Sequence, residues 1–196
     1  MTAHPRPNVT RAAEGLLRRR FTVAEVEAMV AAGVMAEDER VELIGGELVP
    51  MSPKANQHEV VKVALLYKWY RCAPATVNLA PETTFRLSED TYLEPDIVIY
   101  DRASGLKGLS GAGVLLVVEI ADSSLRYDVG RKATLYASFG VRELWVIDAV
   151  QLTARVFREP GAGGYGVADD CPPDAILTPL VAPADFALRL GDLDIE

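Results

Sequence analysis

The sequence predicts an α/β or α+β fold in which helices flank a central mixed β-sheet. Helical and strand patterns follow one another in the order helix, hairpin, helix, strands, helix, strands, which is typical of this class. Residues 114–120 (VLLVVEI) form an unbroken run of β-branched residues and leucines, which indicates a strand covered on both faces. The chain has 196 residues and is 49% hydrophobic, so it can bury a substantial core.

The first half of the chain predicts two helices, a hairpin and two strands. Residues 21–33 favour a helix because Thr22 and Glu25 have the spacing of a capping box. A Gly-Gly pair in the middle of residues 40–51 is typical of a two-residue hairpin turn. The other predicted elements are an apolar helix at 58–70 and strands at 83–88 and 96–100.

The second half predicts one further helix between strands. Four glycines in residues 104–113 indicate a loop before the strand at 114–120. A helix is expected from about residue 128 to 139, because Gly140 then supplies a stop. The remaining predictions are strands at 141–148 and 153–159 and a loop at 161–166. The less regular segment after it either covers the sheet or forms an interface.

Composition and charge exclude several classes of protein. Two cysteines are too few for a disulfide scaffold or a Cys-rich zinc site. The apolar runs are too short for a transmembrane helix, and no signal-peptide core follows the start, so we expect a soluble, cytoplasmic protein with no membrane partner. The net charge of -8 argues against a protein that coats nucleic acid, although it allows an enzyme that contacts nucleic acid in one cleft.

The charge is unevenly distributed along the chain. Residues 1–20 sum to +4 and predict a flexible basic arm, most simply a solvated tail. Residues 21–196 are expected to form a single domain. Its last thirty residues, 167–196, sum to -6, so residues 1–166 carry only -2. Much of the acidity therefore lies away from the predicted core.

Two carboxylates on predicted core strands are the first candidate site residues. Glu119 is the only charge in the strand at 114–120, and a buried carboxylate must be neutral, paired or bound to a cation. Asp96 opens the apolar strand at 96–100 directly after Pro95. A divalent cation between them would remove their repulsion. The alternative for Glu119 is a structural carboxylate that caps a sheet edge or pairs with an arginine.

Lys132 is the third candidate. Helical spacing places it on the same stripe as Leu135 and Phe139, which must face the core, so Lys132 should point towards the sheet. The alternative is a local ion pair with Asp128, four residues earlier. By themselves, Glu42 is an ordinary exposed strand carboxylate and His58 a capping or packing residue. Neither of the two histidines lies in a recognised Ser-His-Asp triad motif, so the sequence argues against a serine hydrolase.

Five separated segments resemble the Uma-two family, which belongs to the PD-(D/E)XK nuclease superfamily and is described as restriction endonucleases. They lie in VELIGGEL, in the helix opened by His58, in EPDIVIY and in the long stretch VVEIADSSLRYDVGRKATLYASFGVRELWVID, in the family's order between about Phe21 and Phe157. The resemblance implies a restriction-endonuclease-like core: a central mixed sheet flanked by helices, with an N-terminal helix and β-hairpin.

The resemblance also assigns residues. Asp96 matches the Asp of the PD motif, Glu119 the second metal-binding acid, and Glu42 the acid of the family's E-L-I-x-G segment. The usual lysine two residues after the acid is replaced by Ala121, and Lys132 matches a lysine that has moved to the helix. Asp128 matches the Asp of the same D-x-x-x-K segment.

These assignments imply a Mg²⁺- or Mn²⁺-dependent endonuclease that hydrolyses phosphodiester bonds, most simply in DNA. Glu42, Asp96, Glu119 and Lys132 would be the catalytic residues; the metal ligands would be Asp96, Glu119 and the carbonyl of Ile120. Nucleases of this superfamily often act as dimers, so the resemblance also implies a homodimer. Two alternatives stay open: a nuclease fold retained as a binding or assembly module with little catalysis, and a metal-dependent phosphodiesterase acting on RNA.

Overall fold

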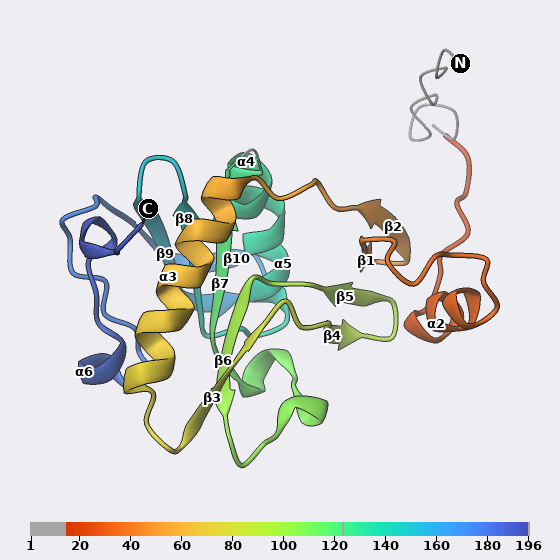
Figure 1. Cartoon of the computed structure of the whole chain (residues 1–196). Helices are drawn as coiled ribbons and strands as arrows, with labels where there is room; N and C mark the ends of the chain where they lie inside the picture. The colour runs from red at the N-terminus through yellow and green to blue at the C-terminus, as the bar shows by residue number, and fades with distance from the viewer. Residues whose placement is uncertain (1–14, 123, 196) are drawn as a thin grey trace.

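The protein is described by a computed structural model that covers residues 15–122 and 124–195 (Figure 1). Two β-sheets of unequal size form its framework. The predicted basic arm, residues 1–20, falls mostly outside the described residues. Of its last part, Arg18 forms an ion pair of 3.1 Å with Glu47.

The larger sheet is mixed, as the sequence predicts. Its strand order is β10-β9-β8-β7-β6-β3. Within the described chain, β7 and β8 form the sheet's one parallel pair, and the other neighbours run antiparallel. The strands are β3 (Val77–Pro81), β6 (Ile97–Asp101), β7 (Val114–Ala121), β8 (Glu143–Asp148), β9 (Thr153–Gly161) and β10 (Gly164–Cys171).

The smaller sheet contains the predicted hairpin. Its order is β2-β1-β5-β4, with every pair antiparallel. Gly45 and Gly46 form the hairpin turn at positive φ, a conformation that glycine adopts without steric cost. The strands are β1 (Val41–Ile44), β2 (Glu47–Pro50), β4 (Phe85–Ser88) and β5 (Thr91–Leu93). Helix α2 (Val23–Ala31), with the predicted capping box, packs against β1.

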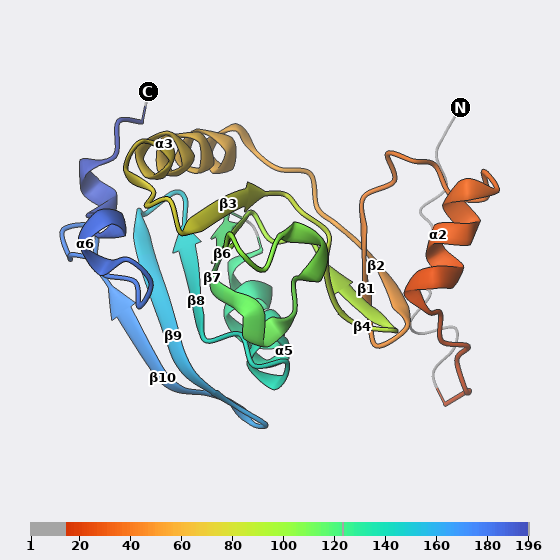
Figure 2. The ribbon, with the colours of Figure 1, turned by 90° about the horizontal axis from the view of Figure 1, so that it is seen from below.

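Helices cover the larger sheet on both faces, which explains the continuous apolar run of β7 (Figure 2). Leu116, Val118 and Ile120 pack into the core cluster that includes α3 (Asn56–Cys72). The intervening Val117 and Ala121 pack into the cluster that includes α5 (Ala133–Ser138). Because side chains alternate along a strand, Glu119 faces the α5 side.

The C-terminal segment covers the sheet. Leu177, Phe186 and Leu190 belong to the same core cluster as α3, and the Trp69 indole N–H donates to the Phe186 carbonyl at 3.1 Å. This segment contains two short helices, α6 (Pro183–Phe186) and η4 (Leu190–Asp192). Of the two roles that the sequence leaves open for it, the structure places it against the sheet.

Two aspects of the sequence prediction need correction. Strands β3, β5 and β10 were not expected: β10 is mostly exposed and polar and β5 has only three residues, so neither carries a clear alternating pattern. The helix predicted from about residue 128 to 139 is instead a π-helical turn, η3 (Asp128–Lys132), followed by α5, and a short helix that was not expected, α4 (Leu125–Tyr127), precedes them. The predicted glycine loop contains two 3₁₀ turns, η1 (Leu106–Gly108) and η2 (Gly111–Gly113).

Candidate active site

Strand register brings Asp96 and Glu119 together. Ile97, the first residue of β6, is paired with Val118 on the antiparallel strand β7. Asp96 therefore lies opposite Glu119 at the end of this strand pair. The contact between the strands is fixed by the Ile120 N–H, which donates to Asp96 Oδ2 at 2.7 Å. Residues 23 positions apart in the sequence thus supply two neighbouring carboxylates.

Glu119 receives two donors from the helical segment that covers its face of the sheet. Lys132 Nζ lies 3.2 Å from Glu119 Oε1, and the Tyr136 hydroxyl donates to the same oxygen at 2.6 Å. All the polar contacts that the described chain gives Glu119 fall on Oε1, so Oε2 is left for another ligand. The arginine pairing considered for Glu119 is replaced by a lysine–tyrosine pair.

The π-helical turn presents both Asp128 and Lys132 to the pocket. The Ala133 N–H donates five residues back to the Asp128 carbonyl, which widens the turn. Both side chains are buried, with Lys132 Nζ 3.8 Å from Asp128 Oδ1 and the Ser124 hydroxyl 2.5 Å from Asp128 Oδ2. The local ion pair with Asp128 is therefore present, but it is longer than the contacts that Lys132 makes with carboxylates of the two sheets.

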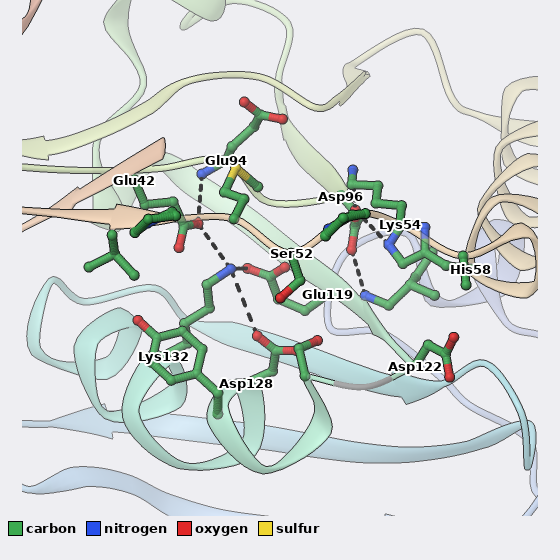
Figure 3. Close-up of a pocket in the computed structure, with 18 residues that line it drawn as sticks. Glu42, Ser52, Lys54, His58, Glu94, Asp96, Glu119, Asp122, Asp128 and Lys132 are labelled. Carbon is green, nitrogen blue, oxygen red and sulfur yellow. Dashed lines mark hydrogen bonds and ion pairs between the residues drawn. The ribbon is translucent and has the colours of Figure 1, made fainter. Parts of the chain in front are cut away.

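Glu42 brings the smaller sheet into the site. It lies on β1, where its Oε1 accepts the Glu94 N–H at 3.1 Å and lies 3.0 Å from Lys132 Nζ. Its side chain is buried, so the alternative of an exposed strand carboxylate does not hold. Lys132 thus joins three acids from three separate segments, as Figure 3 shows.

Asp96 is surrounded by two residues that sequence reasoning did not place in the site. Lys54 Nζ lies 2.8 Å and His58 Nε2 3.0 Å from Asp96 Oδ1. His58 is on the first turn of α3, and Lys54 is on the connection between β2 and α3. Tyr136 was also missed, although it follows Lys132 by one helical turn. A cation in an irregular connection carries no sequence signal, so Lys54 could be found only from the structure.

All the sequence-predicted site residues line one pocket of about 350 Å³, which opens between the two sheets and the first turns of α3 and α4 (Figure 3). Lys132 converges with its acids at one end of the pocket, whereas Lys54 and His58 meet Asp96 at the other. The chemistry-bearing residues that line it are Glu42, Lys54, His58, Glu94, Asp96, Glu119, Asp122, Asp128 and Lys132.

The acids at the two ends differ in their electrostatics. Burial raises the pKa of Glu119 to about 8. Lys132 acts to lower this pKa, whereas the neighbouring carboxylates act to raise it. Burial also opposes ionisation of Asp96, but the hydrogen bond and charge of His58, together with Lys54, lower its pKa to about 2. Burial would lower the pKa of Lys132, yet the surrounding acids raise it well above its usual range. The site therefore holds an ionised Asp96, a charged Lys132 and a deficit of positive charge around Glu119.

The donor chemistry at Asp96 and Glu119 fits a hard divalent cation. Mg²⁺ is usually held by one or two carboxylates and keeps water or phosphate oxygens as its other ligands. Among residues 15–122 and 124–195, no group of three or more His, Cys, Asp or Glu side chains is arranged to hold a metal ion. A cation bound here would therefore depend on two carboxylates, the Ile120 carbonyl, solvent and substrate, with Glu119 Oε2 as a free oxygen.

The fold and the pocket define an α/β domain with a carboxylate–lysine site. A family model named Uma2, "Putative restriction endonuclease", matches residues 23–191. The chain belongs to this family. No curated protein matches the chain. The fold is similar to that of a crystal structure of "a putative nuclease belonging to DUF820" from Anabaena variabilis ATCC 29413, with a TM-score of 0.67 and 14% identity over 88% of this chain and 96% of that one. No helix in the described part of the chain is long and apolar enough to cross a membrane.

Proposed function

We propose that this protein is a Mg²⁺- or Mn²⁺-dependent endonuclease that hydrolyses phosphodiester bonds in DNA. The observation that carries the proposal is the convergence of Asp96, Glu119 and Lys132 in one pocket of a nuclease-family chain. Two carboxylates and a lysine are the groups needed to hold a hard cation and to stabilise charge on a phosphate. That the protein works in the cytoplasm and as a homodimer stays a prediction.

Each residue has a role that follows from its contacts. Asp96 and Glu119, with the carbonyl of Ile120, would hold the cation, which supplies Lewis-acid polarisation of the phosphate and a more acidic water. Lys132 is fixed by three acids, so its ammonium would be held in place to orient the attacking water or to offset phosphate charge. Glu42 positions Lys132 and would contact a second cation or a bound water.

Plasmid nicking tests the proposal directly. We expect the purified protein to convert supercoiled plasmid to the nicked form with Mg²⁺ or Mn²⁺ and not with EDTA. Asp96→Asn keeps the volume of the side chain but removes its charge, and it should abolish nicking. Equal nicking by wild type and Asp96→Asn would contradict the assignment. Parallel assays with single-stranded RNA of matched length separate a DNase from an RNase.

A binding or assembly module without catalysis is the second candidate. Two observations favour it: the net charge is -8, and Lys54 and His58 already contact Asp96 Oδ1. Calorimetry with Mn²⁺ discriminates between the two, because a module needs no metal, whereas an enzyme of this type must bind one at Asp96. Absence of binding by the wild-type protein favours the module.

A further inference from the structure

Lys54 belongs to a closed ring beside the pocket in which acidic and basic side chains alternate. It bridges Asp96 at 2.8 Å and Glu82 at 2.6 Å. Lys62 continues the ring from Glu82 to Glu59 at 2.6 and 2.7 Å. His58 closes it, with Nδ1 3.1 Å from Glu59 and Nε2 on Asp96. In this ring Lys54 is the member that joins the candidate metal ligand to the outer, half-exposed Glu82.

The contacts of Asp96 show where a cation would compete. Ile120 N–H occupies Oδ2, and Oδ1 accepts from both Lys54 and His58, so three of about four acceptor positions are used. A divalent cation on this carboxylate would lie next to the Lys54 ammonium, and like charges at such distances repel strongly. A cation bound through Oδ1 would therefore displace one of the two side chains from that oxygen.

Of the two side chains at Oδ1, Lys54 has the less rigid backbone, although its own side chain is also largely buried. His58 lies on a seventeen-residue helix, is buried, and is held at its other ring nitrogen by Glu59. Lys54 lies in a connection without regular structure, beside the exposed Ser52 and Pro53, and a lysine stem allows its ammonium to swing. Glu82 does not need Lys54 as its only partner, because Lys62 remains on the same oxygen.

The surroundings of Lys54 favour an anion as its next partner. Lys54 lines the pocket and precedes α3 directly. Ala55, the N-cap residue of α3, offers no side-chain acceptor to the first N–H groups, and the positive end of a helix adds to the attraction of an anion. In a nucleic-acid enzyme the anion that reaches this place is a backbone phosphate.

We propose that Lys54 is a metal-responsive phosphate-binding residue: it neutralises Asp96 in the metal-free protein and moves to a backbone phosphate of the nucleic acid when a divalent cation takes its place. This inference rests on the proposed function, because it requires Asp96 to be a metal ligand. Metal binding and nucleic-acid binding then become coupled through one side chain, since the cation on Asp96 makes the ammonium available.

Calorimetry with Mn²⁺ tests the first half of the proposal. Lys54→Met keeps the apolar stem and removes the competing charge, so its dissociation constant for Mn²⁺ should be about tenfold lower than in wild type, a usual effect of one charge at contact distance. Lys62→Met is the matched control: it removes an ammonium from the same Glu82 without touching Asp96, and we expect a change below about threefold. Thermal unfolding of all three proteins checks that they are folded, and Lys54→Gln provides a second variant.

Salt dependence of duplex binding tests the second half. The affinity for a short labelled duplex is followed by fluorescence anisotropy against salt concentration, with Ca²⁺ and with EDTA, and the duplex is checked on a gel for integrity. With Ca²⁺, the slope of log affinity against log salt should be smaller by about 0.9 in Lys54→Met than in wild type, as for the loss of one phosphate contact. With EDTA, the two slopes should agree.

The outcomes separate this inference from the proposed function. If wild type binds Mn²⁺ but Lys54→Met binds it equally or more weakly, or if the salt slope does not change, the role of Lys54 is overturned and the metal site stands. If wild type does not bind Mn²⁺ at all, both proposals fall. Tighter Mn²⁺ binding together with a smaller slope supports the coupling.

Discussion

Glu119 and Glu143 are buried carboxylates on neighbouring strands, β7 and β8, and their surroundings are opposite. Glu143 is fully buried, and four donors satisfy it. Its Oε1 accepts from the Trp145 indole at 3.0 Å and from two nitrogens of Arg158 at 2.9 and 2.6 Å, and its Oε2 accepts the Leu180 N–H at 2.7 Å. Arg158 also donates to the Thr178 carbonyl, so this cluster fastens the C-terminal segment to the sheet.

Glu119 shares its surroundings with three other acids and one lysine. Its donors fall on one oxygen, and its side chain lines a pocket. Burial of a charge therefore does not by itself distinguish a functional acid from a structural one. The useful distinction is whether the protein supplies a balancing charge and a donor for each oxygen: Glu143 has both, and Glu119 has neither in full.

The largest expected effect is on activity at Glu119. Glu119→Gln preserves the shape of the side chain and removes the charge that would hold the cation, so the nicking rate should fall by about 10³-fold or more. The free energy of unfolding should change by less than about 1 kcal/mol, because the substitution takes one negative charge out of a cluster of four acids and keeps the shape of the side chain. Nicking kinetics and urea denaturation measure the two quantities. A large loss of stability instead would place Glu119 with the structural acids.

Glu143→Gln should have the reverse effect. Loss of the charge weakens the paired contact with Arg158, and we expect the free energy of unfolding to fall by about 2–4 kcal/mol. Nicking per folded molecule should stay within about twofold of wild type, because the residue is outside the pocket lining. Urea denaturation followed by tryptophan fluorescence is a suitable measurement, since Trp145 contacts Glu143. Unchanged stability would contradict the fastening role.

An intermediate effect is expected at Lys132. Lys132→Met keeps the stem packed and removes the ammonium, so the nicking rate should fall by about 10²-fold at saturating Mn²⁺. Mn²⁺ affinity should not weaken, because a positive charge next to Glu119 has been removed. Lys132→Arg, which keeps the charge, should recover part of the rate. Weaker metal affinity in the Met variant would mean that Lys132 organises the ligands and does not act on the substrate.

The smallest expected effect is at Tyr136. Tyr136→Phe removes one hydrogen bond to Glu119 Oε1 while it retains the ring that stacks on Phe85. The loss of one hydrogen bond to a carboxyl group corresponds to about 1–2 kcal/mol, or about tenfold in the rate. Nicking kinetics at several Mn²⁺ concentrations show whether the loss lies in metal affinity or in turnover. No change in either would mean that Lys132 alone positions Glu119.

Sequence reasoning reached the carboxylates and the lysine because each breaks a pattern. Glu119 interrupts an apolar strand, and Lys132 shares its predicted helical stripe with the buried Tyr136, so burial of both follows from periodicity. Leu135, expected to face the core on the same stripe, is only partly buried. Glu42 came only from the family resemblance, since its segment alone reads as an exposed strand. His58, expected as a cap or packing residue, instead lies with its Nε2 3.0 Å from Asp96 Oδ1.

The sequence by itself determined the mixed α/β class, the capped first helix, the Gly-Gly hairpin and the buried strand with its single acid. These features depend on residues close together in the chain, where capping, turn geometry and side-chain alternation act. Only the tertiary structure decided which oxygen of Asp96 meets Lys54 and which acids share Lys132. Those contacts join segments 42 and 90 residues apart, and such pairings depend on sheet register and on a π-helical turn that no local pattern encodes.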